Sequence, residues 1–144
     1  MNSKNISLVQ ESWKQVVPIA DQAAALFYDE LFALDPSLKK LFKGDMKAQG
    51  RKLTSMLNTA VVNLARLDAI LPAVEDLGRR HVGYGVEPAH YGTVGTALIA
   101  TLEKGLGGGF TPDVRAAWVE AYTTLAAAMQ DAAADVGAEA TALG

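Results

Sequence analysis

The chain has 144 residues, of which 50% are hydrophobic and 20% are charged, and its net charge is −3. This length and composition fit one globular domain, and the absence of cysteine excludes disulfides and thiolate metal sites. No basic stripe stands out and no apolar run approaches the roughly 20 residues of a membrane span, so we expect no nucleic-acid partner and no membrane span. The first seven residues do not resemble a signal peptide, and we expect a cytoplasmic protein.

The first third of the chain has the three-and-four spacing of apolar residues that is typical of amphipathic helices. Ser7 followed by Gln10 predicts a capping box at the start of a first helix, which ends at Pro18. Pro18 is expected in the first turn of a second helix. Asp35 and Pro36 then predict a short third helix, with Asp35 as its N-cap.

The rest of the chain continues as helices separated by glycine, proline and polar breaks. The expected boundaries are residues 43–45, Gly83 or Gly85, Glu87–Pro88, the glycines between 105 and 109, and Thr111–Pro112. The alanine-rich segment from Ala132 to Gly144 has few anchors and is expected to fray. We therefore predict an all-α single domain over residues 1–144, with seven helical segments of which two are short.

His81 is the candidate metal ligand, because it lies on the apolar stripe of its helix, four residues after Leu77. Spacing alone favours an ordinary core histidine whose ring bonds a backbone carbonyl. His90 is the only other histidine, and its spacing from His81 does not place the two side chains on one face. The sequence therefore does not predict a two-histidine metal site. A single histidine is sufficient for heme, which needs only one axial imidazole from the protein.

Several motifs in order along the chain resemble those of bacterial single-domain globins, including Vitreoscilla-type hemoglobins, the methanotroph single-domain globin and the globin halves of flavohemoglobins. They are Glu11–Lys14, Leu26–Phe32, Leu41–Phe42, Gln49–Leu53, Leu77–Val86, Ala89–Gly95 and Ala117–Tyr122. The resemblance covers nearly the whole chain. It implies the globin fold, a 3-over-3 helical sandwich with a short or absent D helix, and one heme b.

The resemblance also implies a role for individual residues. His81 looks like the proximal ligand of the iron, and Tyr28 and Gln49 resemble distal residues that contact bound O2. The side chains that would line the heme are Phe42, Leu53, Leu77, Val86, Tyr91 and Val94, with Leu53 also beside the ligand. Four basic residues are candidates to pair with the heme propionates: Arg51, Lys52, Arg79 and Arg80. Without the resemblance, Tyr28 would be interpreted as a buried tyrosine whose hydroxyl is satisfied, Phe42 and Leu53 as plain core, and Gln49 as a solvated helix residue.

The sequence departs from the family pattern in two places. The interval from Phe42 to Gln49 leaves no room for a helix between them. In flavohemoglobins a glutamate of the last helix polarises the proximal histidine through a tyrosine, but residue 133 is alanine here. Asp131, two residues away, is expected to point elsewhere on the helix.

Three functions remain open at this point. The first is reversible O2 binding, for storage or for supply to respiration, and the missing glutamate favours it. The second is NO dioxygenation with a separate electron-donating reductase. In that case the chain would be an enzyme only together with this reductase. The third is a gas sensor or interaction module. O2, NO and CO are the expected ligands, and the sequence leaves the oligomeric state open.

Overall fold

The computed structural model describes residues 1–42, 44–83, 86 and 88–143 of the chain. Within these residues the regular secondary structure is entirely helical, which confirms the all-α prediction. The α-helices are α1 (Ser3–Val16), α2 (Ala20–Leu34), α3 (Met46–Val62), α4 (Leu67–Gly83), α5 (Pro88–Leu106) and α6 (Pro112–Leu143). Short 3₁₀ helices are η1 (Val17–Ile19), η2 (Pro36–Leu41), η3 (Leu64–Arg66) and η4 (Gly107–Gly109).

Three of the predicted helix starts are confirmed by their capping bonds. The Asp35 side chain accepts from the backbone N–H of the second residue of η2, and Asp45 does the same for α3. The Thr111 hydroxyl accepts from the backbone N–H of Val114 in the first turn of α6. No helix separates η2 from α3 in the described residues between them, as the short interval predicted.

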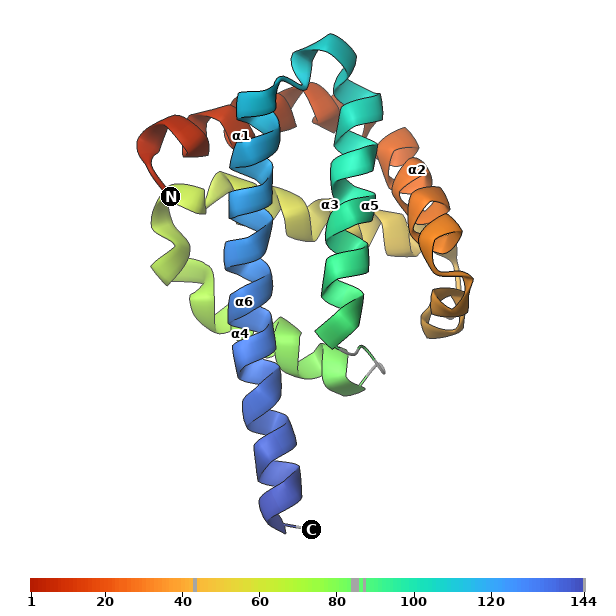
Figure 1. The fold of residues 1–144 in the computed structure, drawn as a ribbon, viewed down its shortest axis with the longest axis vertical. Coiled ribbons are helices and arrows are strands. Elements are labelled where there is room, and N and C mark those ends of the chain that lie inside the picture. The colour runs from red at the N-terminus through yellow and green to blue at the C-terminus, as the bar shows by residue number, and fades with distance from the viewer. Residues whose placement is uncertain (43, 84–85, 87, 144) are drawn as a thin grey trace.

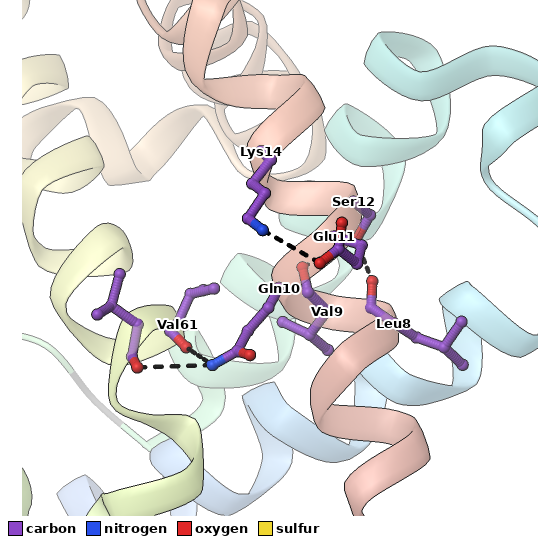
Figure 2. Close-up of polar contacts among 8 residues, drawn as sticks. Leu8, Val9, Gln10, Glu11, Ser12, Lys14 and Val61 are labelled. Atoms are coloured by element: carbon purple, nitrogen blue, oxygen red, sulfur yellow. Dashed lines mark hydrogen bonds and ion pairs between the residues drawn. The ribbon is translucent and has the colours of Figure 1, made fainter.

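The predicted start of the first helix at Ser7 is wrong. Helix α1 begins at Ser3, because the Asn2 side chain accepts from the N–H of Asn5 at 2.8 Å and forms the N-cap. Gln10 does not act as the partner of Ser7. Its amide crosses instead to the end of α3 and donates to the carbonyl of Val61 at 3.0 Å, as Figure 2 shows. The last carbonyls of a helix lack intrahelical partners, so this bond ties α1 to the end of α3.

Helix α6 includes the alanine-rich segment for which fraying is expected, and that expectation stays a prediction. It continues as helix to Leu143, and Ala132, where fraying was expected to begin, is buried. In Figure 1 the last turns of α6 project beyond the rest of the molecule. Alanine has the highest intrinsic helix propensity, which favours the helical conformation in this alanine-rich segment.

The helices pack as two crossing layers around one core. Helices α5 and α6 run side by side, with α1 and α3 crossing behind them and α4 behind the lower part of α6 (Figure 1). Helix α6 packs against α4, α1 and α5, while α2 packs against α5 and α3. No single helix in the described part of the chain is long and apolar enough to cross a membrane. By length and composition alone, α3 and the segment Leu64–Val82 could do so together, but the two are bent by 62° relative to each other.

Two tryptophans connect three of these helices. Trp13 of α1 and Trp118 of α6 lie with their ring centroids 6.1 Å apart. The Trp118 indole N–H donates to the hydroxyl of buried Ser12 at 2.8 Å, and the Trp13 indole N–H donates to Asn58 of α3 at 2.9 Å. Both indole donors are therefore satisfied, as buried polar groups require.

Candidate functional site

His81 lies near the end of α4 and is half-buried. Its Nδ1 lies 2.7 Å from the carbonyl oxygen of Leu77, one turn back. Because a carbonyl only accepts, this bond places the ring proton on Nδ1 and the lone pair of the neutral ring on Nε2. Burial lowers the pKa of His81, and the bond to Leu77 opposes the shift in part. The side chain is thus a neutral imidazole in a fixed orientation, which is the form that ligates a metal.

A glycine holds this part of α4 directly against α6. A Cβ atom at Gly78 would lie 2.3 Å from the carbonyl oxygen of Met129, so only glycine permits the two backbones to approach so closely. Gly78 follows Leu77, whose carbonyl orients the imidazole. The contact between α4 and α6 therefore determines where His81 lies.

Tyr91 and Tyr122 form a second contact of this region with α6. The Tyr122 hydroxyl donates to the backbone carbonyl of Tyr91 at 2.5 Å, and its ring occupies the space that a Cβ at Gly95 would take. Burial raises the pKa of both tyrosines. The Tyr91 hydroxyl is itself buried and has no hydrogen-bond partner within the described structure.

Tyr28 belongs to an aromatic cluster between α2 and η2. Its ring lies 5.3 Å from that of Phe42 and 6.0 Å from that of Phe32, measured between centroids, so the structure brings Tyr28 and Phe42 together. Burial raises the pKa of Tyr28 to about 12. The phenol is therefore protonated at neutral pH, and its hydroxyl makes no hydrogen bond to another described residue.

Helix α3 crosses α2 near Tyr28 and carries Gln49 and Leu53. A Cβ at buried Gly50 would lie 3.1 Å from the Cβ of Ala24, which is one turn before Tyr28. Gln49 and Leu53 are half-buried, and Leu53 packs against the core. The close crossing thus brings the helix of Tyr28 against the helix of Gln49.

The other residues singled out by the sequence fall into two groups. Leu77, Val86 and Val94 are half-buried, and the Val86 N–H donates to the carbonyl of His81 at 3.0 Å. Among the basic residues, Arg79 pairs with Glu75 and Arg80 with Asp76, whereas Arg51 and Lys52 form no ion pair with any described residue.

On α6, residue 133 is alanine, whereas the family pattern described above has a glutamate at this position. Ala133 is half-buried, and Asp131 is exposed, as expected. The bond of Tyr122 to Tyr91 was not predicted from the sequence, where Tyr122 appears only in a motif of the last helix. A tyrosine on a buried stripe signals that its hydroxyl needs a partner, but the sequence does not tell which.

The donor set fits a heme better than a bare metal ion. No group of three or more metal-binding side chains occurs in the described part of the chain. One neutral imidazole with apolar neighbours is what an iron porphyrin requires. Four of the exposed large apolar side chains also lie on α3 and α4, namely Met56, Val62, Leu71 and Val82, and the orphaned Tyr91 hydroxyl lies at the start of α5.

Comparison with known proteins gives one family. Residues 25–129 match the family described as Globin. The Flavohemoprotein of Bacillus subtilis (strain 168) is 30% identical over 133 residues, which cover 88% of this chain and 32% of that protein. The chain thus spans about a third of the length of this curated relative. The matched range contains Tyr28, Gln49 and His81.

Proposed function

The chain belongs to the globin family, and we propose that it holds one heme b through His81 and binds O2 reversibly, for storage or for supply to respiration. Membership of the family implies a heme cofactor and a small gas ligand. The type of heme, the choice of O2 and the role of each residue are parts of the proposal.

The described residues have the properties that these roles require. Heme supplies the iron at which a gas binds and brings four nitrogen ligands of its own, so the protein needs to add one imidazole. The neutral ring of His81, oriented by Leu77, offers the Nε2 lone pair for this purpose. The protonated Tyr28 hydroxyl and the Gln49 amide would donate to the gas ligand, since both are donors at neutral pH.

The apolar side chains around these donors would exclude water from the ligand. Phe42 packs on Tyr28, and Leu53 lies one turn after Gln49 on α3. A dry pocket strengthens each hydrogen bond to the ligand and slows oxidation of ferrous iron.

The buried hydroxyl of Tyr91 is the observation that separates reversible O2 binding from catalysis in this proposal. A carboxylate that accepted from this hydroxyl would polarise the proximal imidazole, and an anionic imidazole favours activation of O2 over its reversible release. Tyr91 has no such partner among the described residues, and position 133 is alanine. This arrangement supports an O2 binder rather than a dedicated NO dioxygenase.

The two functions are separated by measuring both on one preparation. The ferrous heme protein should give a reversible O2 binding curve. With NADH and a generic flavoprotein reductase it should consume NO only slowly. Rapid and sustained NO consumption under these conditions would instead make dioxygenation its function.

A further inference from the structure

A hollow in the surface between α3 and the segment that joins α1 to α2 takes no part in the proposed heme site. Its volume is about 330 Å³, at the lower end of the range that is typical of small-molecule sites. It is lined by Trp13, Val17 and Asp21 from the first part of the chain and by Arg51 and Ser55 from α3, among others. The packing of separate elements, rather than one helix, therefore forms this hollow.

The hollow lies on the opposite face of α3 from the residues proposed to contact the gas ligand. Successive residues of an α-helix are about 100° apart, so Arg51 is roughly 200° from both Gln49 and Leu53 around the helix axis. Ser55, one turn after Arg51, continues the face of Arg51. Arg51 is therefore poorly placed to reach the heme propionates, for which it was one of four candidates.

Two side chains of opposite charge border the hollow without pairing. The carboxylate of Asp21 and the guanidinium of Arg51 are both exposed, and neither forms an ion pair within the described part of the chain. A simple anion in the hollow would be attracted by Arg51 and repelled by Asp21, and a simple cation would meet the reverse. The ligand that satisfies both side chains is a zwitterion, which carries one charge of each sign.

The remaining lining supplies neutral hydrogen-bonding groups and an apolar surface. The Asn58 side-chain oxygen accepts from the Trp13 indole N–H at 2.9 Å, so both side chains are held in place. The amide nitrogen of Asn58 makes no hydrogen bond to another described residue and is able to donate to a ligand. Val17 is 48% exposed and adds apolar area. The hollow thus combines charged, polar and apolar groups, as small-molecule sites do.

We propose that this hollow binds a free α-amino acid with an apolar side chain. The carboxylate of the amino acid would pair with Arg51 and its ammonium group with Asp21. Its side chain would pack on Val17 and Trp13. No heme atom takes part, so this site goes beyond the proposed function and does not depend on it.

The probe for this site is L-leucine, and two analogues isolate its charges. The first, 4-methylpentanoate, lacks only the ammonium group, and the second, isopentylamine, lacks only the carboxylate. Each compound is titrated into ¹⁵N-labelled protein saturated with CO, and the indole N–H signal of Trp13, assigned with Trp13→Phe, is followed by NMR. The indole of Trp118, which donates to Ser12 away from the hollow, is the internal reference and should move less.

The variants Arg51→Gln and Asp21→Asn each remove one charge with little change in size. Arg115→Gln and Asp29→Asn are the matched controls, because both side chains are exposed and neither lines the hollow. Leucine should shift the Trp13 signal saturably, with a dissociation constant on the order of 1 mM. Each analogue should bind about tenfold more weakly or worse, and each test variant should weaken leucine binding about fivefold or more, while the controls stay within about twofold.

Three results would overturn this proposal. One is the absence of a saturable shift up to about 20 mM leucine. Another is equally tight binding of 4-methylpentanoate that is lost in Arg51→Gln alone, which would make the hollow an anion site. The third is equal weakening in the test variants and the controls, which would place the bound leucine elsewhere. Failure of the protein to take up heme would refute the proposed function alone, because the titrations can then be run without CO.

Discussion

Burial shifts the pKa of the titratable side chains at the candidate site. It lowers the pKa of His81 and raises that of Tyr28 to about 12, so the imidazole is neutral and the phenol is protonated near pH 7. The pKa of Tyr91 is raised for the same reason. The site therefore presents an uncharged ligand to a metal and uncharged donors to a gas.

The first prediction concerns His81 as the iron ligand. The purified protein supplied with heme should show a Soret band, and His81→Ala should lose it, because no other described side chain is assigned as an axial ligand. Added imidazole should restore the band in His81→Ala. His90→Ala serves as the control and should keep the wild-type spectrum. An unchanged spectrum in His81→Ala would refute the assignment.

Tyr28 should slow the release of O2. Tyr28→Phe removes the hydroxyl but keeps the ring in its aromatic cluster, so a lost hydrogen bond is the main change. A donor lost from a dry pocket costs more than about 1.4 kcal/mol, which corresponds to a rise of more than about tenfold in the O2 dissociation rate. Stopped-flow displacement of O2 measures this rate. A rate within about twofold of wild type would remove Tyr28 from the ligand site.

At the scale of helices, local chemistry explains what the sequence predicted and what it missed. Asp35, Asp45 and Thr111 act within one turn of themselves, so their effects are visible in the sequence. Pro18 was expected in the first turn of the second helix, but it lies in the separate short helix η1, and α2 begins only at Ala20. The partner of Gln10 is 51 residues away, and that of the Tyr122 hydroxyl is 31 residues away. Such bonds depend on how the helices pack, which the sequence pattern does not encode locally.

The same distinction applies to the candidate site. His81 bonds Leu77, one helical turn back, and the sequence predicted a bond from this ring to a backbone carbonyl. The contact of Gly78 with Met129 joins two different helices and was not predicted from the sequence. The close approach of α2 and α3 at Gly50 likewise emerges only from the packed structure.

Gly78 should be essential for the packing of α4 on α6. Gly78→Ala places a methyl group against the Met129 backbone, which has no side-chain freedom to move away, and overpacking of this kind costs about 1–3 kcal/mol. Urea unfolding measures the change. Gly92→Ala is the control, since a Cβ there meets nothing within 4 Å, and alanine in a helix should be neutral or stabilising by up to about 1 kcal/mol. Equal stability of the two variants would show that α4 is not held to α6 by this contact.

The alanine at position 133 should keep the proximal histidine neutral. We expect the wild-type iron–histidine stretch at ordinary globin frequency, and Ala133→Glu should raise it by giving the Tyr91 hydroxyl an acceptor. Resonance Raman spectra of the ferrous protein measure the frequency. Ala133→Gln controls for size, because an amide carries no charge. A wild-type frequency already at the flavohemoglobin level would mean that another group polarises His81, with Asp131 the first to test.

For the whole molecule, the packing of the helices explains how residues from distant parts of the chain come together at the candidate site. Helix α6 contacts α4 through Gly78 and the start of α5 through Tyr122, so it supports the residues proposed to hold the heme. Helix α3 has Leu53 packed against the core, while its Arg51 and Lys52 are exposed.

The last prediction is the dependence of overall stability on pH in the heme-free protein. The folded pKa of His81 lies below its ordinary value of 6.5, so its contribution to the free energy of unfolding is present above pH 6.5 and is lost as the pH falls through the folded pKa. The folded pKa of Tyr28 is raised from 10.0 to about 12, so its contribution is present below pH 10 and is lost as the pH rises towards 12. Urea unfolding at a series of pH values should therefore show a plateau between these limits. His81→Gln should reduce the loss on the acid side and leave the alkaline side unchanged, while Tyr28→Phe should do the reverse. If both variants kept the wild-type profile, the two groups would not be the ones whose burial couples protonation to folding.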